Sequence, residues 1–136
     1  SREQEELIAR MTGEGRVKRL GAVERRDLPA LIGGAVCLVL PSFYEGFGLP
    51  VIEAMACGTP VACSDRGALP EVAGEAAEYF DPGDPDGIFG AVNNIAGSEK
   101  RKEELRVAGL ERAKDFSWEQ ATKSTLGVFR ETGGVQ

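Results

Sequence analysis

The sequence predicts an α/β fold, with a parallel sheet and helices on its faces. Helical patterns alternate with short apolar runs along the chain, which is typical of βαβ units. Residues 36–40 are apolar throughout, as expected of a strand that is buried on both faces of a parallel sheet. The 136 residues are enough for a single domain with one core.

The first part of the chain predicts a helix, a strand and a second, short helix. Residues 3–11 place their apolar side chains on one helical face, and residues 16–20 resemble a strand that stops at Gly21. Asp27 stands where it could cap a short helix, with Pro29 tolerated in the first turn. Because a helix comes before any strand, we expect the sheet to be incomplete on its N-terminal side.

The rest of the chain alternates strands and helices after a loop at 41–49. Pro50 suits the first turn of a helix, and Gly58 suits its end. Ser117 begins a capping box, and the apolar stripe that contains Trp118 is expected to pack in the core. The remaining predicted elements are strands at 61–63 and 77–80, and helices at 50–56, 69–73, 88–96, 99–114 and 117–136.

Composition excludes several classes of function. The 16 basic and 22 acidic residues give a net charge of −6, which argues against nucleic acid as a partner because phosphates require a basic face. The chain has no histidine. This absence excludes a serine–histidine triad, acid–base catalysis by histidine and most zinc sites within the chain.

Cysteine usage indicates a reducing compartment, and hydropathy predicts no membrane span. Cys37, Cys57 and Cys63 are odd in number and form no CxxC pair, so we expect three small buried side chains and no disulfide framework. The longest uncharged stretch, 28–44, is interrupted by Pro and Gly and is too short to span a membrane. We therefore expect a cytoplasmic protein. The first residue is Ser rather than Met, which suggests a processed, tagged or excised segment.

The most informative segment is 41–58, PSFYEGFGLPVIEAMACG. It follows a predicted strand, and open parallel sheets bind ligands just beyond the carboxyl ends of their strands. Gly46 and Gly48 let backbone amides approach a ligand closely, and the helix behind them directs its positive end to the same place. These features predict an anion site suited to phosphate. A tight turn without a ligand is the alternative interpretation.

Two glutamates in this segment suggest recognition of hydroxyl groups. The two oxygens of a carboxylate match the two donors of a cis-diol such as ribose. Glu53 lies eight residues after Glu45, near the start of the predicted helix, where electrostatic capping is an equal alternative. Glu45 has Phe43, Tyr44 and Phe47 beside it, and a charge in an apolar loop needs a partner. A glycosidase-like carboxylate pair is a further alternative, but this spacing does not fix the separation such a pair requires.

The sequence EGFGLPVIEAMACGTPV, with the two glutamates separated by seven residues, closely resembles the signature of retaining glycosyltransferases of the GT-B fold, family 4, also called group 1. Four other segments resemble the C-terminal domain of that family, so the resemblance covers nearly the whole chain. They are RVKRLGAV at 16–23, DLPALIGGAVCLVLPS at 27–42, GALPEVAGEAAEYFDPGDPDG at 67–87 and FSW at 116–118. The resemblance implies a Rossmann-like parallel sheet and one partial donor-binding domain over 1–136.

The resemblance also implies a role for each site residue. Glu53 would hold the ribose hydroxyls, and Glu45 would contact hydroxyls of the donor sugar. Glu45 is our candidate catalytic residue, although neither carboxylate is assigned as a nucleophile. Glu71 resembles the Glu of an LPE segment in the family, with helix-start electrostatics as the alternative. The implied donor-binding backbone consists of Gly46, Phe47, Gly48 and Leu49 at the diphosphate and sugar, and of Gly21, Ala22 and Val23 at the base.

The implied function is transfer of a hexose from a nucleotide-diphosphate sugar to a sugar or lipid-linked acceptor. The family binds the acceptor through an N-terminal domain that this chain does not contain, so the fragment alone should be inactive. No cofactor and no metal are expected, because amides and cations stabilise the leaving diphosphate. The full-length protein could be peripheral at a membrane. A non-catalytic nucleotide-sugar or partner-binding module is the alternative. A sugar-nucleotide epimerase of similar fold is a weaker one.

The family pattern places two further strands, absent here, between 16–20 and 36–40. Their absence would leave one edge of the 36–40 strand exposed, and such edges recruit other chains. We therefore expect one of two arrangements. The chain forms a homodimer through exposed edges or an exchanged N-terminal helix and strand, or the 16–20 strand moves beside 36–40.

Overall fold

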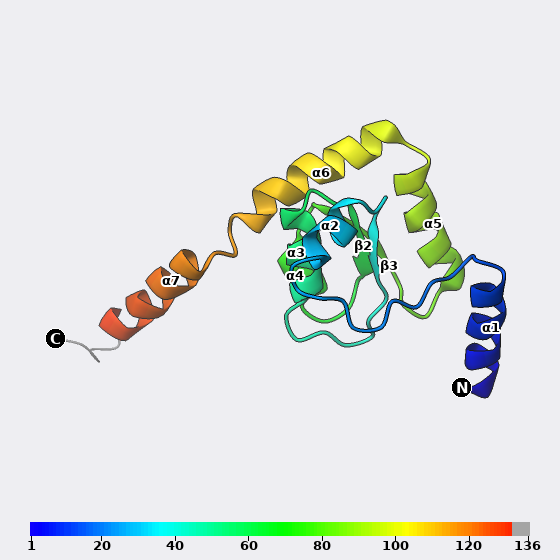
Figure 1. Ribbon diagram of the computed structural model, residues 1–136. Helices are drawn as coiled ribbons and strands as arrows, with labels where there is room; N and C mark the ends of the chain where they lie inside the picture. The colour runs from blue at the N-terminus through cyan, green and yellow to red at the C-terminus, as the bar shows by residue number, and fades with distance from the viewer. Residues whose placement is uncertain (132–136) are drawn as a thin grey trace.

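The computed structural model describes residues 1–131, apart from the side chains of Trp118 and Glu131, and has a three-stranded sheet with helices around it (Figure 1). The strands are β1 (Leu38–Leu40), β2 (Val61–Ser64) and β3 (Ala77–Phe80). The helices in this range are α1 (Arg2–Gly13), α2 (Leu28–Gly33), α3 (Leu49–Ala56), α4 (Leu69–Ala73), α5 (Pro85–Ala96), α6 (Glu99–Ala113) and α7 (Trp118–Glu131).

The sheet is parallel with the order β1-β2-β3, which confirms the α/β prediction. Leu38 pairs with Val61, and Val61 pairs with Ala77, so β2 is the central strand. Every residue of β2 is buried. This is the burial that an apolar strand of a parallel sheet requires.

Side chains of β2 alternate between two apolar layers. Val61 and Cys63 belong to a core cluster with Val51 and Met55 of α3 and with Leu69 of α4. Ala62 belongs to a second cluster that contains residues of β3, α5 and α6, namely Phe80, Ala91, Ile95 and Leu105. The sheet is therefore covered on both faces, as successive side chains of a strand point to opposite sides.

Side-chain caps set several helix starts. The Asp84 carboxylate accepts a hydrogen bond from the amide of Asp86, so α5 begins at Pro85, three residues before the predicted start. Ser98 caps α6 in the same way. The Ser117 hydroxyl accepts from the amide of Gln120 at 3.1 Å, as its predicted capping position requires.

The predicted strand at 16–20 is wrong. These residues form a coil, because a strand needs a neighbour to complete its ladder and within residues 1–131 only β1, β2 and β3 pair. The segment also does not move beside β1, so that alternative is wrong too. One edge of β1 is left without a strand in the described chain, and the predicted strand at 36–40 is shortened to its three paired residues.

Three smaller expectations need correction. Asp27 occupies the N-cap position of α2 but makes no side-chain cap hydrogen bond. Cys63 is fully buried, whereas Cys37 and Cys57 are only partly buried. The predicted stripe of the last helix is not part of either core cluster where it is described: Ala121, Thr125 and Phe129 are exposed, and Figure 1 shows α7 extending away from the sheet. The predicted core position of Trp118 and the extension of the helix through 132–136 lie outside the described residues.

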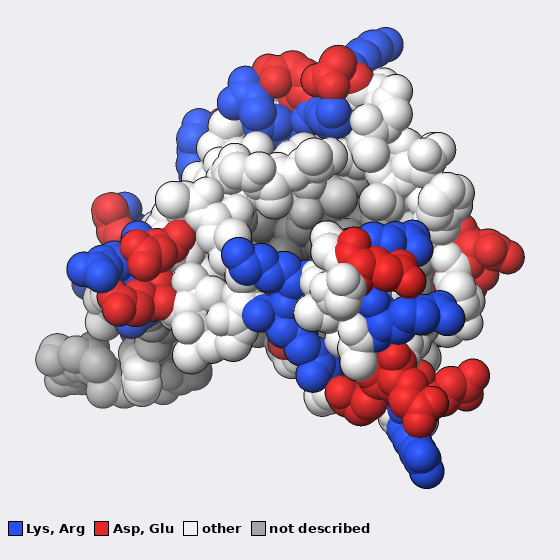
Figure 2. Space-filling model, turned by 45° about the vertical axis from the view of Figure 1, so that its right-hand side comes forward, with Lys and Arg blue, Asp and Glu red and all other residues white. Residues whose placement is uncertain are grey.

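None of the described helices is both long and apolar enough to cross a lipid bilayer. Figure 2 shows Lys and Arg interspersed with Asp and Glu over one face of the molecule, with a hollowed, largely uncharged area between them. Several ion pairs lie within α6, for example Arg106 with Glu103 and Lys102 with Glu99.

Candidate functional site

The loop that connects β1 to α3 lies at the carboxyl edge of the sheet, where the sequence predicts a ligand site. β1 ends at Leu40 and α3 begins at Leu49. Since the strands are parallel, the residues that follow β2 and β3 reach the same edge. The site is therefore built from three loops around the start of one helix.

Gly48 is required by its backbone and by its surroundings. Its φ of +89° is in the left-handed region, and a Cβ at this position would lie 2.7 Å from the Cδ2 atom of Leu69. The same Cβ would lie 3.8 Å from the Cγ atom of Glu45. Gly48 therefore lets the loop pack directly onto α4 while remaining beside Glu45.

A second glycine holds the backbone of Glu45. Gly67 has a φ of +62°, and a Cβ there would lie 2.9 Å from the carbonyl oxygen of Glu45. The amide of Ala68 donates a hydrogen bond to that oxygen at 3.2 Å. The turn after β2 thus fixes the position from which the Glu45 side chain extends.

Residues 46–49 present backbone amides at the start of α3. Within residues 1–131 none of these four amides donates a hydrogen bond to another part of the chain. Pro50, in the first turn of α3, has no amide hydrogen to lose. The amides and the positive end of the helix together are suited to bind an anion such as phosphate.

The two candidate carboxylates lie before and after this helix start in the sequence, and the first turn of α3 itself contains no acidic residue, so Glu53 belongs to the second turn. Glu45 is partly buried in the loop, and Glu53 is exposed on α3. Neither forms an ion pair with a described cation. Because side chains tilt toward the N-terminus of a helix, we expect Glu53 to be directed toward the loop. Both carboxylates remain available for hydrogen bonds to a ligand.

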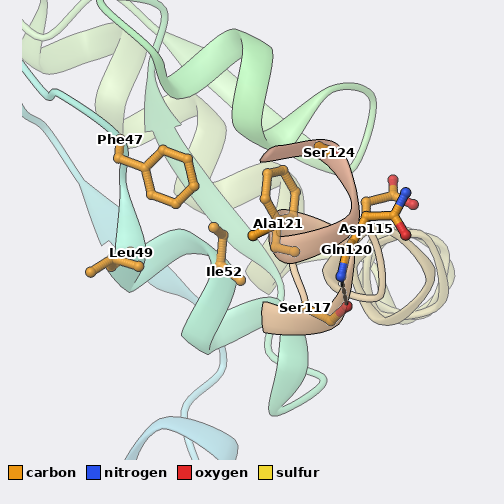
Figure 3. A pocket seen from close by; sticks show the side chains of 9 residues that line it. Phe47, Leu49, Ile52, Asp115, Ser117, Gln120, Ala121 and Ser124 are labelled. Atoms are coloured by element: carbon orange, nitrogen blue, oxygen red, sulfur yellow. Dashed lines mark hydrogen bonds between the residues drawn. The ribbon is translucent and has the colours of Figure 1, made fainter. Parts of the chain in front are cut away.

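A groove of about 380 Å³ lies beside the amides and was not anticipated from the sequence. Figure 3 shows Phe47, Leu49 and Ile52 on one side of it and residues of the α7 region on the other. Phe47 packs edge to face against Phe116, with ring centroids 6.0 Å apart. The sequence shows that both residues are phenylalanine, but it does not show that they meet, because their contact depends on the path of the chain after α6.

Arg66 is a cation at this edge that sequence analysis missed. It follows β2 and forms ion pairs with Asp65 at 3.0 Å and with Asp81, which follows β3, at 2.8 Å. A hydrogen bond from the amide of Gly83, with the Arg66 guanidinium beside it, holds the pKa of Asp81 below its ordinary value. The available signal was the position of charged residues directly after two neighbouring strands, Asp65 and Arg66 after β2 and Asp81 after β3.

The residues assigned to the base, Gly21, Ala22 and Val23, lie in exposed coil. Gly21 has a φ of +64° with open space around its missing Cβ. The strand expected to position these residues is absent, so their assignment remains a prediction. Glu71 lies in the first turn of α4 and is exposed. Burial raises the pKa of Cys63 to about 12, which keeps that thiol protonated at neutral pH.

Comparison with known proteins places the chain among glycosyltransferases. The family model "Glycosyl transferases group 1" matches residues 2–112. The O-antigen chain mannosyltransferase B of Escherichia coli is 44% identical over 92% of this chain and 33% of its own length. The MMP alpha-(1->4)-mannosyltransferase of Mycolicibacterium hassiacum is 36% identical over 93% of this chain and 32% of its own length. The chain thus spans about a third of the length of these curated relatives.

Solved structures give the same result. The sucrose-phosphate synthase of Thermosynechococcus elongatus superposes with a TM-score of 0.85 and 30% identity, over 99% of this chain and 35% of that one. The C-terminal domain of a group 1 glycosyl transferase from Francisella tularensis superposes with a TM-score of 0.68 and, at 23% identity, supports the fold alone. The chain has the Rossmann-like α/β architecture of a GT-B glycosyltransferase, and it belongs to the family of group 1 glycosyl transferases.

Proposed function

We propose that this chain is the donor-binding part of a retaining, family 4 glycosyltransferase, which binds a nucleotide-diphosphate sugar and transfers the sugar to an acceptor. The observation that carries the proposal is the start of α3, where the amides of 46–49 are free of hydrogen bonds to the described chain and adjoin Glu45, with Glu53 following in the second turn of the helix. Membership of the family makes a nucleotide sugar the natural occupant of this arrangement.

Each part of the site has a role in the proposed reaction. The amides of Phe47, Gly48 and Leu49 bind the diphosphate and stabilise the negative charge that develops on it as it leaves. Glu53 accepts hydrogen bonds from the ribose hydroxyls, and Glu45 accepts them from hydroxyls of the sugar that is transferred. The proposal uses no metal and no cofactor, because the amides and the end of the helix supply the stabilisation of charge.

The remaining parts of the function belong to a longer protein in this proposal. The acceptor, a sugar or a lipid-linked sugar, binds to an N-terminal domain, and the 136-residue chain alone transfers no sugar. The open edge of β1 makes a homodimer of the isolated chain a further part of the proposal. The full-length protein is proposed to act in the cytoplasm or at the surface of a membrane.

Replacement of Glu53 tests the proposal. In the full-length protein, Glu53→Ala should weaken binding of the nucleoside diphosphate by about 1.5–3 kcal/mol, the range for a hydrogen bond to a charged group. The free energy of unfolding should change little, because Glu53 is exposed. Calorimetry with UDP, GDP and ADP measures the affinity. Glu111→Ala, which removes an exposed glutamate on α6, is the matched control.

Two results decide between the interpretations. Unchanged affinity in Glu53→Ala contradicts the ribose assignment. Binding of a diphosphate without turnover of any nucleotide sugar by the full-length protein favours the alternative, a non-catalytic binding module. Since two relatives are named mannosyltransferases, mannose nucleotides are the first donors to assay.

A further inference from the structure

We infer that Arg112 is a positioning residue for the donor loop. It holds Phe47 and Gly48 from two sides, through Phe116 and through α4, without touching the ligand itself. The inference rests on the proposed function, because it concerns binding of a diphosphate by the amides of this loop. Arg112 lies near the end of α6, well separated in sequence from the loop.

The Arg112 guanidinium caps the end of α4. Its Nε donates to the carbonyl oxygen of Val72 at 2.9 Å, and its Nη2 donates to that of Glu71 at 2.7 Å. Carbonyl groups in the last turn of a helix have no partner within the helix and carry its negative end. A cation with two parallel donors satisfies both carbonyls at once. The Nη1 atom is held by Asp115 at 2.9 Å, so the whole planar group is fixed.

The first connection to the loop runs through aromatic rings. The Cζ atom of Arg112 lies 4.9 Å from the centroid of the Phe116 ring, within the range of a cation–π contact. Phe116 in turn contacts Phe47 edge to face, with an angle of 81° between the rings. Phe47 is 48% exposed, so this contact is a main restraint on its side chain.

The second connection runs through α4. Its first residue, Leu69, is fully buried and lies against Gly48 so closely that a Cβ on Gly48 would be only 2.7 Å from the Leu69 side chain. α4 has only five residues, too few to be stable by itself, so its position depends on what holds its two ends. Arg112 binds carbonyl groups at the C-terminal end of α4, and Gly48 packs against Leu69 at its N-terminal end.

These contacts form a closed path around the peptide group between Phe47 and Gly48. The path runs from Phe47 to Phe116, to Arg112, along α4 to Leu69, and back to Gly48. A loop with glycines at 46 and 48 is otherwise free to adopt many conformations, and ordering it on binding costs affinity. Arg112 therefore prepares the loop for an anion before the anion arrives.

The test compares two arginines of the same helix in the full-length protein. Arg112→Ala removes the brace, whereas Arg101→Ala breaks the hydrogen bonds of Arg101 to Glu78 of β3 and to Glu104 of α6. We measure affinity for UDP, GDP and ADP by calorimetry, and the midpoint of thermal unfolding for each variant. Arg112→Ala should weaken diphosphate binding by about tenfold more than Arg101→Ala, a coupling within the usual range for connected residues.

Two further variants separate positioning from stability. Arg112→Lys keeps the charge but not the paired donors or the flat face, so it should unfold near the wild-type temperature and still bind the diphosphate more weakly. In a Phe47→Ala background, Arg112→Ala should reduce affinity by a smaller factor than in wild type, because the aromatic connection is already broken.

The outcomes distinguish this inference from the proposed function. If wild type binds a diphosphate and Arg112→Ala weakens binding no more than Arg101→Ala does, the inference alone is contradicted. Equal effects of Arg112→Ala with and without Phe47 contradict the aromatic connection. If wild type binds none of the three diphosphates, both the proposed function and the inference fail.

Discussion

Residues 38–113 and residues 1–37 differ in how far their side chains are buried. The first region contains every buried side chain named in the two core clusters, from Val51 to Leu105. The second contains two helices and a long coil, and none of its residues is buried. Figure 1 shows α1 at the margin of the molecule, joined to α2 by the coil. Both regions fall largely within the part that matches the family model.

The difference shows that a pattern of apolar residues needs a partner surface. In 38–113 the buried apolar side chains of each core cluster meet other elements, as Met55 of α3 meets Gly109 of α6 at close range. In 1–37 Ile32 and Cys37 pack against the margins of the two core clusters, whereas Leu7 and Leu20 are 45% and 47% exposed. Most of the stability of a helix or strand in a protein comes from such packing rather than from local preference.

Amide hydrogen exchange should show the largest contrast between the two regions. Amides of β2 should exchange only on global unfolding, which for a domain of this size corresponds to about 5–15 kcal/mol. Amides of residues 18–23 lie in coil without strand partners and should exchange at nearly the rate of an unstructured peptide. Exchange measured residue by residue in the 136-residue chain tests this. Comparable protection in both regions would mean that 18–23 pairs with another strand, as in a homodimer.

The same substitution should have different consequences in the two regions. Leu105, in α6, is 1% exposed, and Leu105→Ala should lower the free energy of unfolding by about 2–5 kcal/mol. Leu7, in α1, is 45% exposed, and Leu7→Ala should change it by no more than about 0.5 kcal/mol. Urea unfolding of the two variants measures both values. A large loss in Leu7→Ala would show that α1 packs on a surface not seen in the structure.

Most of the fold could be predicted from the sequence, because in 38–113 local signals and packing agree. Pro50 and Gly58 bound α3 as expected, and the apolar run that ends at Leu40 is a strand. The exceptions depend on partners. The predicted strand at 16–20 has the composition of a strand but no neighbour, and whether a neighbour exists cannot be read from the segment itself.

The local part of the candidate site could also be anticipated, whereas its supports could not. The amides of 46–49 and the glutamates at 45 and 53 are contained in one segment, so their spacing is visible in the sequence. The hydrogen bond of Arg112 to Val72 of α4 joins residues 40 positions apart in the sequence. Its contact with Phe116 depends on how the chain turns after α6 ends. Such contacts are set by the packing of α6 across the sheet, which no local pattern encodes.

The smallest contrast that we expect concerns acid stability at the carboxyl edge of the sheet. The pKa of Asp81 is lowered, first by the hydrogen bond from the Gly83 amide and then by Arg66. Because the folded-state pKa is lower than the unfolded value, Asp81 stabilises the fold above the unfolded pKa, and this contribution is lost as the pH falls through the folded pKa. Asp81→Asn should therefore be less stable than wild type at neutral pH, and the difference should shrink below about pH 4. Glu5→Gln, at the exposed pair of Glu5 with Arg19 in the N-terminal region, is the control for loss of one carboxylate. Urea unfolding of the three proteins between neutral and acid pH measures the effect, and a constant difference between wild type and Asp81→Asn would contradict it.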